Sequence, residues 1–191
     1  MRWVTLMVGV CAIGVCGFAV SPQEPPTEAA KEIRPTPLIL EKSEGEHRVH
    51  RSAGNKMGTA PFILKVDPKN GAAQKLVLFT EDLQPGASIP RHKHPGAEEI
   101  IILQTGSSRV HLGNTVREVG AGATVFIPPD TWISVDNIGK EPVSLIAIFS
   151  APGYEEYMRA ISVREGEVNI PLSNNELDAI RKQHPHSVIY E

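Results

Sequence analysis

Short strand-like segments recur every eight to twelve residues between Leu38 and Ala151, and this spacing limits the fold more than any other feature of the chain. Turn signals separate the segments, and they draw on a composition of 16 glycines and 16 prolines in 191 residues. We expect strands at 74–80, 88–94, 98–104, 107–112, 124–127, 132–137 and 143–149. Because no helix-length periodic run interrupts them, the sequence predicts an all-β sandwich or β-barrel.

The segment after these strands, residues 152–191, has the pattern of an extension with short helices. One helix is expected within 152–160. A second is expected over 173–182, because Ser173 and Glu176 form a capping-box pattern ahead of Leu177 and Ile180. We expect this second helix to pack on the outside of the barrel.

The first nineteen residues have the pattern of a secretory signal peptide. Arg2 precedes an uncharged apolar run, and Gly17 and Ala19 supply small residues three and one positions before a cut. Cleavage would make the mature protein secreted or periplasmic. Retention as a membrane anchor is the alternative, because the run reaches the lower length limit for a spanning helix. Both cysteines fall inside this segment, so the mature protein would fold without disulfides.

Residues 20–37 have the composition of a proline-rich linker, with too few apolar groups to form a core. The predicted organisation is a signal peptide at 1–19, a linker at 20–37, a β-barrel at 38–151 and the C-terminal extension at 152–191. The chain carries 19 basic and 22 acidic side chains, mixed along its length, for a net charge of −3. This mixture argues against nucleic acid as a partner.

Metal-ligating side chains are concentrated in one short stretch. His92 and His94 are two residues apart in an expected strand, so their imidazoles point to the same face. Glu99 begins the next expected strand and would lie beside them if the two strands were antiparallel neighbours. Two imidazoles and a carboxylate suit Fe, Mn, Co, Ni or Zn and leave positions open for water or substrate. A bare His-x-His pair is more often only a charged strand end.

A wider pattern surrounds these three residues. Gly86 stands six positions before His92, and Gly106 stands seven positions after Glu99. The complete spacing resembles the first motif of the cupin superfamily, in its small single-domain (type 2) form. The resemblance implies a cupin-type double-stranded β-helix, or jelly-roll barrel, and a divalent metal ion held by His92, His94 and Glu99. It also implies a homodimer joined through an edge strand.

The second cupin motif is present only in part. Gly122, Pro128 and Asn137 have its spacing, but Asp130 and Ile133 stand where cupins usually have a glycine and a fourth ligand, a histidine. Ile133 has no donor atom. Two interpretations stay open. Either three residues hold a metal ion with more open coordination positions, which we favour, or the pocket binds an organic ligand without metal.

Other polar residues near these motifs are expected to face outward. Glu98 competes with Glu99 for the ligand position, but strand alternation places Glu98 on the outer face. Trp132 should likewise point away from the side to which Ile133 points. The remaining histidines are expected to be solvated, and only a segment covering the barrel mouth would make one of them a ligand: His47, His50, His111, His184 and His186.

These observations predict an exported metal-binding protein that acts on a small organic molecule. Fe(II) is the favoured ion, with Mn, Ni, Co or Zn as alternatives, because an open site with two histidines and one carboxylate is typical of non-haem dioxygenases. Apart from Glu98, no unassigned acid or base that could serve the site is evident from the sequence. The alternative is a non-catalytic module of the cell envelope that binds a small molecule or a metal ion.

Overall fold

The computed structural model describes residues 34–51 and 61–191. The expected signal peptide at 1–19 and most of the expected linker at 20–37 lie outside the described residues. Residues 34–37 are exposed and have no regular secondary structure. Within the described ranges, no helix is both long enough and apolar enough to cross a membrane.

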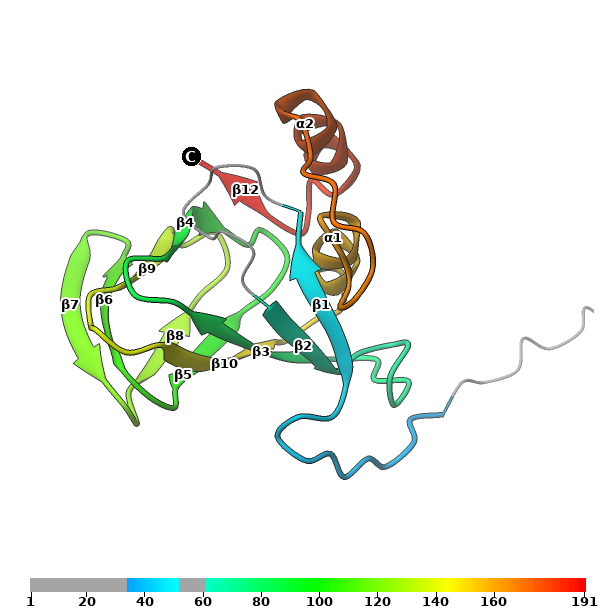
Figure 1. The fold of residues 1–191 in the computed structure, drawn as a ribbon, viewed down its shortest axis with the longest axis horizontal. Helices are drawn as coiled ribbons and strands as arrows, with labels where there is room; N and C mark the ends of the chain where they lie inside the picture. The colour runs from blue at the N-terminus through cyan, green and yellow to red at the C-terminus, as the bar shows by residue number, and fades with distance from the viewer. Residues whose placement is uncertain (1–33, 52–60) are drawn as a thin grey trace, which may run out of the picture. The chain divides into compact units, whose positions relative to one another are not determined.

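Two antiparallel sheets form the body of the fold (Figure 1). The larger sheet contains, in spatial order, β11 (Ser162–Arg164), β1 (Glu46–His50), β2 (Pro61–Val66), β3 (Val77–Leu83), β10 (Val143–Phe149), β5 (Glu99–Leu103) and β8 (Thr124–Ile127). The smaller sheet contains β12 (Ile189–Tyr190), β4 (Ser88–Lys93), β9 (Ile133–Asn137), β6 (Ser107–Leu112) and β7 (Thr115–Gly120). The predicted all-β jelly-roll barrel is confirmed.

The core forms between the sheets because alternate residues of each strand turn inward. Leu64, Leu83, Leu103 and Leu145 are fully buried. Burying a side chain of this size contributes about 1.5–3 kcal/mol to stability, so the apolar core can stabilise a barrel that contains no cysteine. Gly106, at the end of the first motif, turns the chain with a φ of 80°, and an added Cβ there would lie 2.7 Å from a methyl group of Val143.

Local sequence patterns predicted the bounds of three strands correctly. The expected strands 107–112, 124–127 and 143–149 have the observed bounds of β6, β8 and β10. The expected strand 74–80 is displaced, because β3 covers Val77–Leu83. The expected set lacked β1, β2, β7, β11 and β12. Along β7, five of the six residues are exposed, so no alternation of apolar and polar residues marks it.

The segment after residue 151 contributes to both sheets. Helix α1 (Tyr154–Ala160) leads into β11, which pairs with β1, and helix α2 (Asn174–Gln183) leads toward β12, which pairs with β4. The predicted capping box is confirmed, since the Ser173 side chain accepts from the Glu176 backbone and Glu176 bonds back to Ser173. The extension is therefore part of the barrel.

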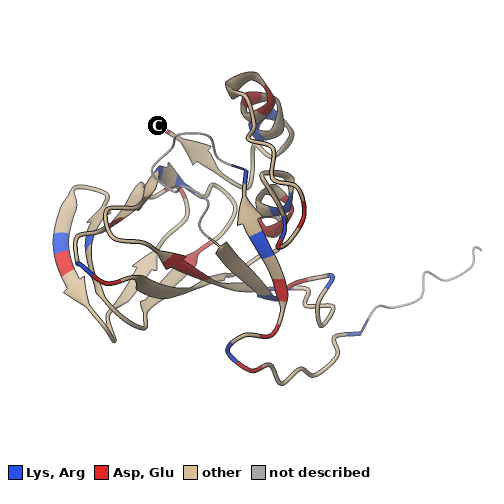
Figure 2. Cartoon of the chain, viewed as in Figure 1, with Lys and Arg blue, Asp and Glu red and all other residues tan. Residues whose placement is uncertain are grey.

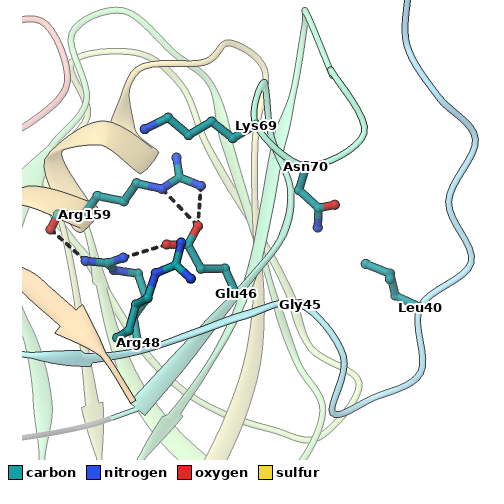
Figure 3. A pocket seen from close by; sticks show the side chains of 8 residues that line it. Leu40, Gly45, Glu46, Arg48, Lys69, Asn70 and Arg159 are labelled. Carbon is teal, nitrogen blue, oxygen red and sulfur yellow. Dashed lines mark hydrogen bonds and ion pairs between the residues drawn. The ribbon is translucent and has the colours of Figure 1, made fainter. Parts of the chain in front are cut away.

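An ion-pair network fastens α1 to β1 (Figure 3). Arg159 donates to Oε2 of Glu46 at 2.7 Å and also to the buried Asp67. Arg48 donates to Oε1 of Glu46 at 2.6 Å and to the Arg159 carbonyl at 3.1 Å. Because these groups are largely buried and multiply bonded, they hold α1 in one position over the sheet. Elsewhere basic and acidic residues are interspersed, for example on β7 (Figure 2).

Candidate metal centre

Strand β4 directs the two motif histidines into the barrel. His92 pairs across the sheet with Ile133 on β9, and the register shifts between Ile89 and His92, where Pro90 interrupts the ladder. His94 follows the end of β4, and its carbonyl accepts from the backbone N–H of Asp130. The side chains of His92 and His94 are both buried, with relative exposures of 3% and 2%.

Glu99 reaches the histidines from the opposite sheet. The two motif strands are not neighbours in a sheet, since β4 pairs with β9 and β12 whereas β5 pairs with β10 and β8. The turn containing Pro95 and Gly96 instead carries the chain from one sheet to the other. Glu99, the first residue of β5, therefore faces the histidines across the barrel interior and is itself buried.

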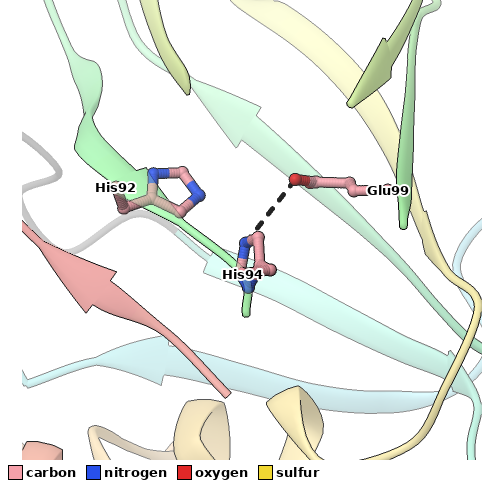
Figure 4. Close-up of side chains that lie close together, drawn as sticks. All are labelled: His92, His94 and Glu99. Atoms are coloured by element: carbon pink, nitrogen blue, oxygen red, sulfur yellow. Dashed lines mark ion pairs between the residues drawn. The ribbon is translucent and has the colours of Figure 1, made fainter. Parts of the chain in front are cut away.

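The three side chains converge on one point (Figure 4). One ligand atom from each residue lies within 4.8 Å of the corresponding atoms of the other two. Nε2 of His94 is 3.5 Å from Oε2 of Glu99, and the rings of His92 and His94 are nearly perpendicular, with centroids 4.9 Å apart. The structure thus brings together all three residues that the sequence predicts as metal ligands.

Backbone carbonyls fix the orientation of both imidazoles. Nδ1 of His92 is 2.7 Å from the Pro90 carbonyl, and Nδ1 of His94 is 2.6 Å from the Ser187 carbonyl. Since a carbonyl oxygen only accepts, Nδ1 carries the proton in each ring, and the Nε2 lone pair is free to ligate. Ser187 belongs to the C-terminal extension, so that segment orients one of the candidate ligands.

Burial sets the protonation of the site. Desolvation, helped by the nearby Glu81 charge, raises the pKa of Glu99 to about 8. Desolvation, helped by neighbouring His92, lowers the pKa of His94 to about 3, and burial also lowers the pKa of His92. Nε2 of His94 and Oε2 of Glu99 have no hydrogen-bond partner in the described structure. A divalent cation would supply the missing partner for both atoms, so the donor set fits a metal ion.

Aromatic rings and the C-terminal segment cover the centre. The rings of Tyr154 and Phe149 lie 4.6 and 4.9 Å from the His94 ring, and Tyr190 of β12 lies 5.7 Å from the His92 ring, all measured between centroids. This cover was not predicted from the sequence. A strand of two residues, such as β12, is too short to leave a detectable periodicity in the sequence. The tyrosines themselves were therefore the local signal.

The departures from the second cupin motif have clear structural correlates. Asp130 has a φ of 58°, which lies in the left-handed region. This conformation explains why cupins usually have a glycine at this position, and aspartate tolerates it better than most residues. Its carboxylate binds Lys93 at 3.0 Å. Ile133 is fully buried and points inward as predicted, so a hydrocarbon occupies the usual place of the fourth ligand.

Most residues predicted to face outward do so. Glu98 is exposed. His47 and His111 are partly exposed, beside Glu165 and Asp136, and His186 is exposed. His184 is half-buried against the Tyr157 ring. The Trp132 ring lies beneath the charged ends of Arg91 and Lys93, 5.6 and 5.4 Å from its centroid.

His50 contradicts the prediction of a solvated side chain. It is 1% exposed, because its ring packs against Phe62 inside the barrel, and its Nε2 lies 3.4 Å from Oε1 of Glu81. Glu81 is a second inward carboxylate that was not predicted from the sequence. It alternates with Val77, Phe79 and Leu83, which also turn inward, and this period-two pattern was the signal that could have revealed it.

Residues 79–149 match the family model described as Cupin domain. The two-sheet barrel, with its two motif histidines and glutamate, thus has a cupin-type fold, and the matched range includes most of its central strands. An uncharacterized protein of Methanocaldococcus jannaschii is 34% identical over 67 residues, which are 35% of this chain and 54% of that protein. The chain thus spans about half the length of this curated relative.

Two solved structures are similar to part of this chain. A structure described as a predicted oxalate decarboxylase from Thermotoga maritima is 22% identical, with a TM-score of 0.53 over 60% of this chain and 100% of that chain. An oxalate decarboxylase of Lactobacillus farciminis, in a formate complex, is 26% identical, with a TM-score of 0.45 over 49% of this chain and 29% of that chain. The likeness to the Thermotoga structure shows the cupin double-stranded β-helix.

Proposed function

We propose that this protein binds one divalent transition-metal ion, with Fe(II) favoured, through His92, His94 and Glu99, and that it catalyses a dioxygenase-type oxidation of a small organic molecule. One observation supports this most strongly. Three donor atoms within 4.8 Å of one another are buried in the barrel, and two of them have no hydrogen-bond partner among the described residues. Burying such groups without a partner is costly, so the arrangement is explained by an ion that compensates them.

Three protein ligands leave part of a metal ion's coordination sphere open. Fe(II) bound there would supply the one-electron chemistry that allows dioxygen to react with a chelating substrate. The chain's own contribution is to orient the imidazoles through the Pro90 and Ser187 carbonyls and to exclude water with Phe149 and Tyr154. Ile133 in place of a polar ligand makes the wall more apolar, which favours an enol, phenol or diketone over a sugar.

A second candidate function follows from the complete burial of the centre. His92, His94 and Glu99 are each no more than 4% exposed, and β12 lies over them. A site closed in this way also suits a non-catalytic module that captures a metal ion or a small ligand. The two functions differ in turnover, which can be measured directly.

The test is oxygen uptake by metal-loaded protein. The protein is stripped of metal, reloaded with Fe(II), Mn(II), Ni(II) or Zn(II), and assayed with diketones and catechols. Oxalate is also tested, because the similar Thermotoga structure is described as a predicted oxalate decarboxylase. We expect Fe(II)-dependent oxygen uptake with a diketone or catechol, and none in the His92→Ala variant. Tight metal binding without uptake for any compound would support the binding module.

The cellular setting is part of the same proposal. The pattern of residues 1–19 supports a secreted or periplasmic protein, with a membrane anchor as the alternative. Exposed Phe126 on edge strand β8 and Val116 on edge strand β7 support a homodimer. Fractionation of the native host and light scattering of the purified protein test these two points.

A further inference from the structure

We propose that His50 and Glu81 form a second polar subsite inside the barrel, which binds a hydroxyl group of the small molecule whose chelating end occupies the three-residue metal centre. This inference rests on the proposed function and adds a substrate class to it: a chelating molecule that carries a further hydroxyl on an apolar framework.

The His50–Glu81 pair is buried but incompletely bonded. His50 and Glu81 are 1% and 3% exposed. Neither ring nitrogen of His50, nor Oε1 of Glu81, has a hydrogen-bond partner within the described part of the chain. His50 Nε2 and Glu81 Oε1 are 3.4 Å apart, but the two atoms do not form a hydrogen bond with each other. Buried polar atoms of this kind are normally satisfied, and a ligand is one way to satisfy them.

Glu81 and the candidate ligand Glu99 share the inner face of one sheet. Along β10, Leu145 pairs with Glu81 of β3, and Phe149 pairs with Glu99 of β5. Cross-strand partners lie on the same face, and all four residues are buried. The Glu81 charge also raises the pKa of Glu99 and opposes the lowering of the His92 pKa, so it acts on the metal centre through the interior.

The chemistry of the pair selects the ligand. A neutral imidazole offers one donor and one acceptor, and a carboxylate only accepts, so a hydroxyl group, which both donates and accepts, satisfies them best. Phe62 lies against the His50 ring, 4.8 Å between centroids, and Phe79 packs beside Phe62. Phe62 and Phe79 therefore give the His50–Glu81 pair apolar surroundings, which suit a hydroxyl group carried on an aromatic framework.

The experiment compares two catechols that differ by one hydroxyl group. 4-(Hydroxymethyl)catechol and 4-methylcatechol are titrated anaerobically into Fe(II)-loaded protein, and metal content is measured for every sample. We expect wild type to bind the hydroxymethyl compound about ten-fold more tightly, as hydrogen bonds to a charged group allow. In samples loaded to the same metal content, Glu81→Gln and His50→Gln should reduce this preference to about two-fold or less without changing the affinity for 4-methylcatechol.

Glu98→Gln is the matched control, since Glu98 is exposed, and it should keep the full preference. Equal affinity of metal-loaded wild type for the two catechols, or binding of neither, would overturn the subsite even if both variants failed to fold. Wild type that cannot be loaded with metal would instead overturn the proposed function. If folded Glu81→Gln and His50→Gln kept the preference for the hydroxymethyl compound, the hydroxyl group would bind in another part of the barrel, and the proposed subsite would be wrong.

Discussion

Nε2 of His94 and Oε2 of Glu99 face each other at 3.5 Å inside the barrel, and neither atom has a hydrogen-bond partner in the described ranges. The ordinary solution for a buried histidine and glutamate is a direct hydrogen bond, which needs a shorter distance and a shared proton. In this barrel the Nδ1 proton of His94 is already committed to the Ser187 carbonyl, so the Nε2 lone pair faces the Glu99 carboxyl. A cation that displaces the Glu99 proton would satisfy both atoms.

Removing either imidazole should weaken metal binding. His92→Ala and His94→Ala should each lower affinity by at least about ten-fold, because each removes one of three donors, while the barrel stays folded on its apolar core. Metal titration and circular dichroism measure the two effects. His111→Ala, which removes a partly exposed histidine, is the control. Stoichiometric metal in the double variant His92→Ala/His94→Ala would refute the assignment of ligands.

Metal affinity should depend on pH through Glu99. In the metal-free protein the pKa of Glu99 is about 8, so binding at lower pH must expel its proton. His94, with a pKa of about 3, is already neutral and contributes no proton. We expect affinity to rise about ten-fold per pH unit between about pH 6 and 8 and then to level off. Affinity that does not change over this range would mean that Glu99 is not a ligand.

The same shift predicts how the stability of the metal-free protein depends on pH. An unfolded glutamate ionises near its ordinary pKa of 4.5, whereas folded Glu99 holds its proton until about pH 8. Folding is therefore progressively disfavoured as pH rises through this window. The metal-free Glu99→Gln variant should exceed wild type in free energy of unfolding by a few kcal/mol at pH 8 and by little at pH 4.5. Urea denaturation at both pH values measures the difference, and an equal difference at both would contradict a raised pKa of Glu99 as its cause.

Restoring the usual fourth donor should tighten metal binding. Ile133 is fully buried and lies opposite His92 in the β4–β9 pair, so the variant Ile133→His directs a new imidazole toward the centre. We expect an affinity gain of about ten-fold or more, comparable to the loss from removing one donor. Ile133→Asn is a control that adds a polar group without an imidazole. Unchanged affinity in a folded Ile133→His protein would show that position 133 lies outside the coordination sphere.

Local sequence patterns predicted seven of the twelve described strands and the capping box but could not assign strands to sheets. The bounds of β8 and β10 follow from their apolar residues and flanking turns, and the Ser173–Glu176 cap follows from two side chains three residues apart. That β4 and β5 belong to different sheets depends on pairing between distant segments, which short-range periodicity does not encode. The convergence of the three ligands was nevertheless implied by the resemblance to the first cupin motif.

The His50–Glu81 pair could not be predicted in the same way. The expected strand 74–80 ended one residue before Glu81, so this carboxylate was not considered as part of an inward face. His50 has the charged neighbours Arg48 and Arg51, which suggested a solvated stretch. The burial of Arg48 and His50 depends on residues more than a hundred positions away, including Arg159 and Ser162. The folded extension contributes that cover, together with Phe62 beside His50.

Anomalous diffraction from crystals of Fe(II)-loaded protein would show whether the three side chains hold an ion. Data collected on either side of the iron absorption edge locate the ion without reference to activity. We expect one peak per chain, about 2.0–2.2 Å from Nε2 of His92, Nε2 of His94 and a carboxylate oxygen of Glu99. Iron bound elsewhere, or an interior without an iron peak in protein shown to be loaded, would contradict the assignment of these residues as a metal centre.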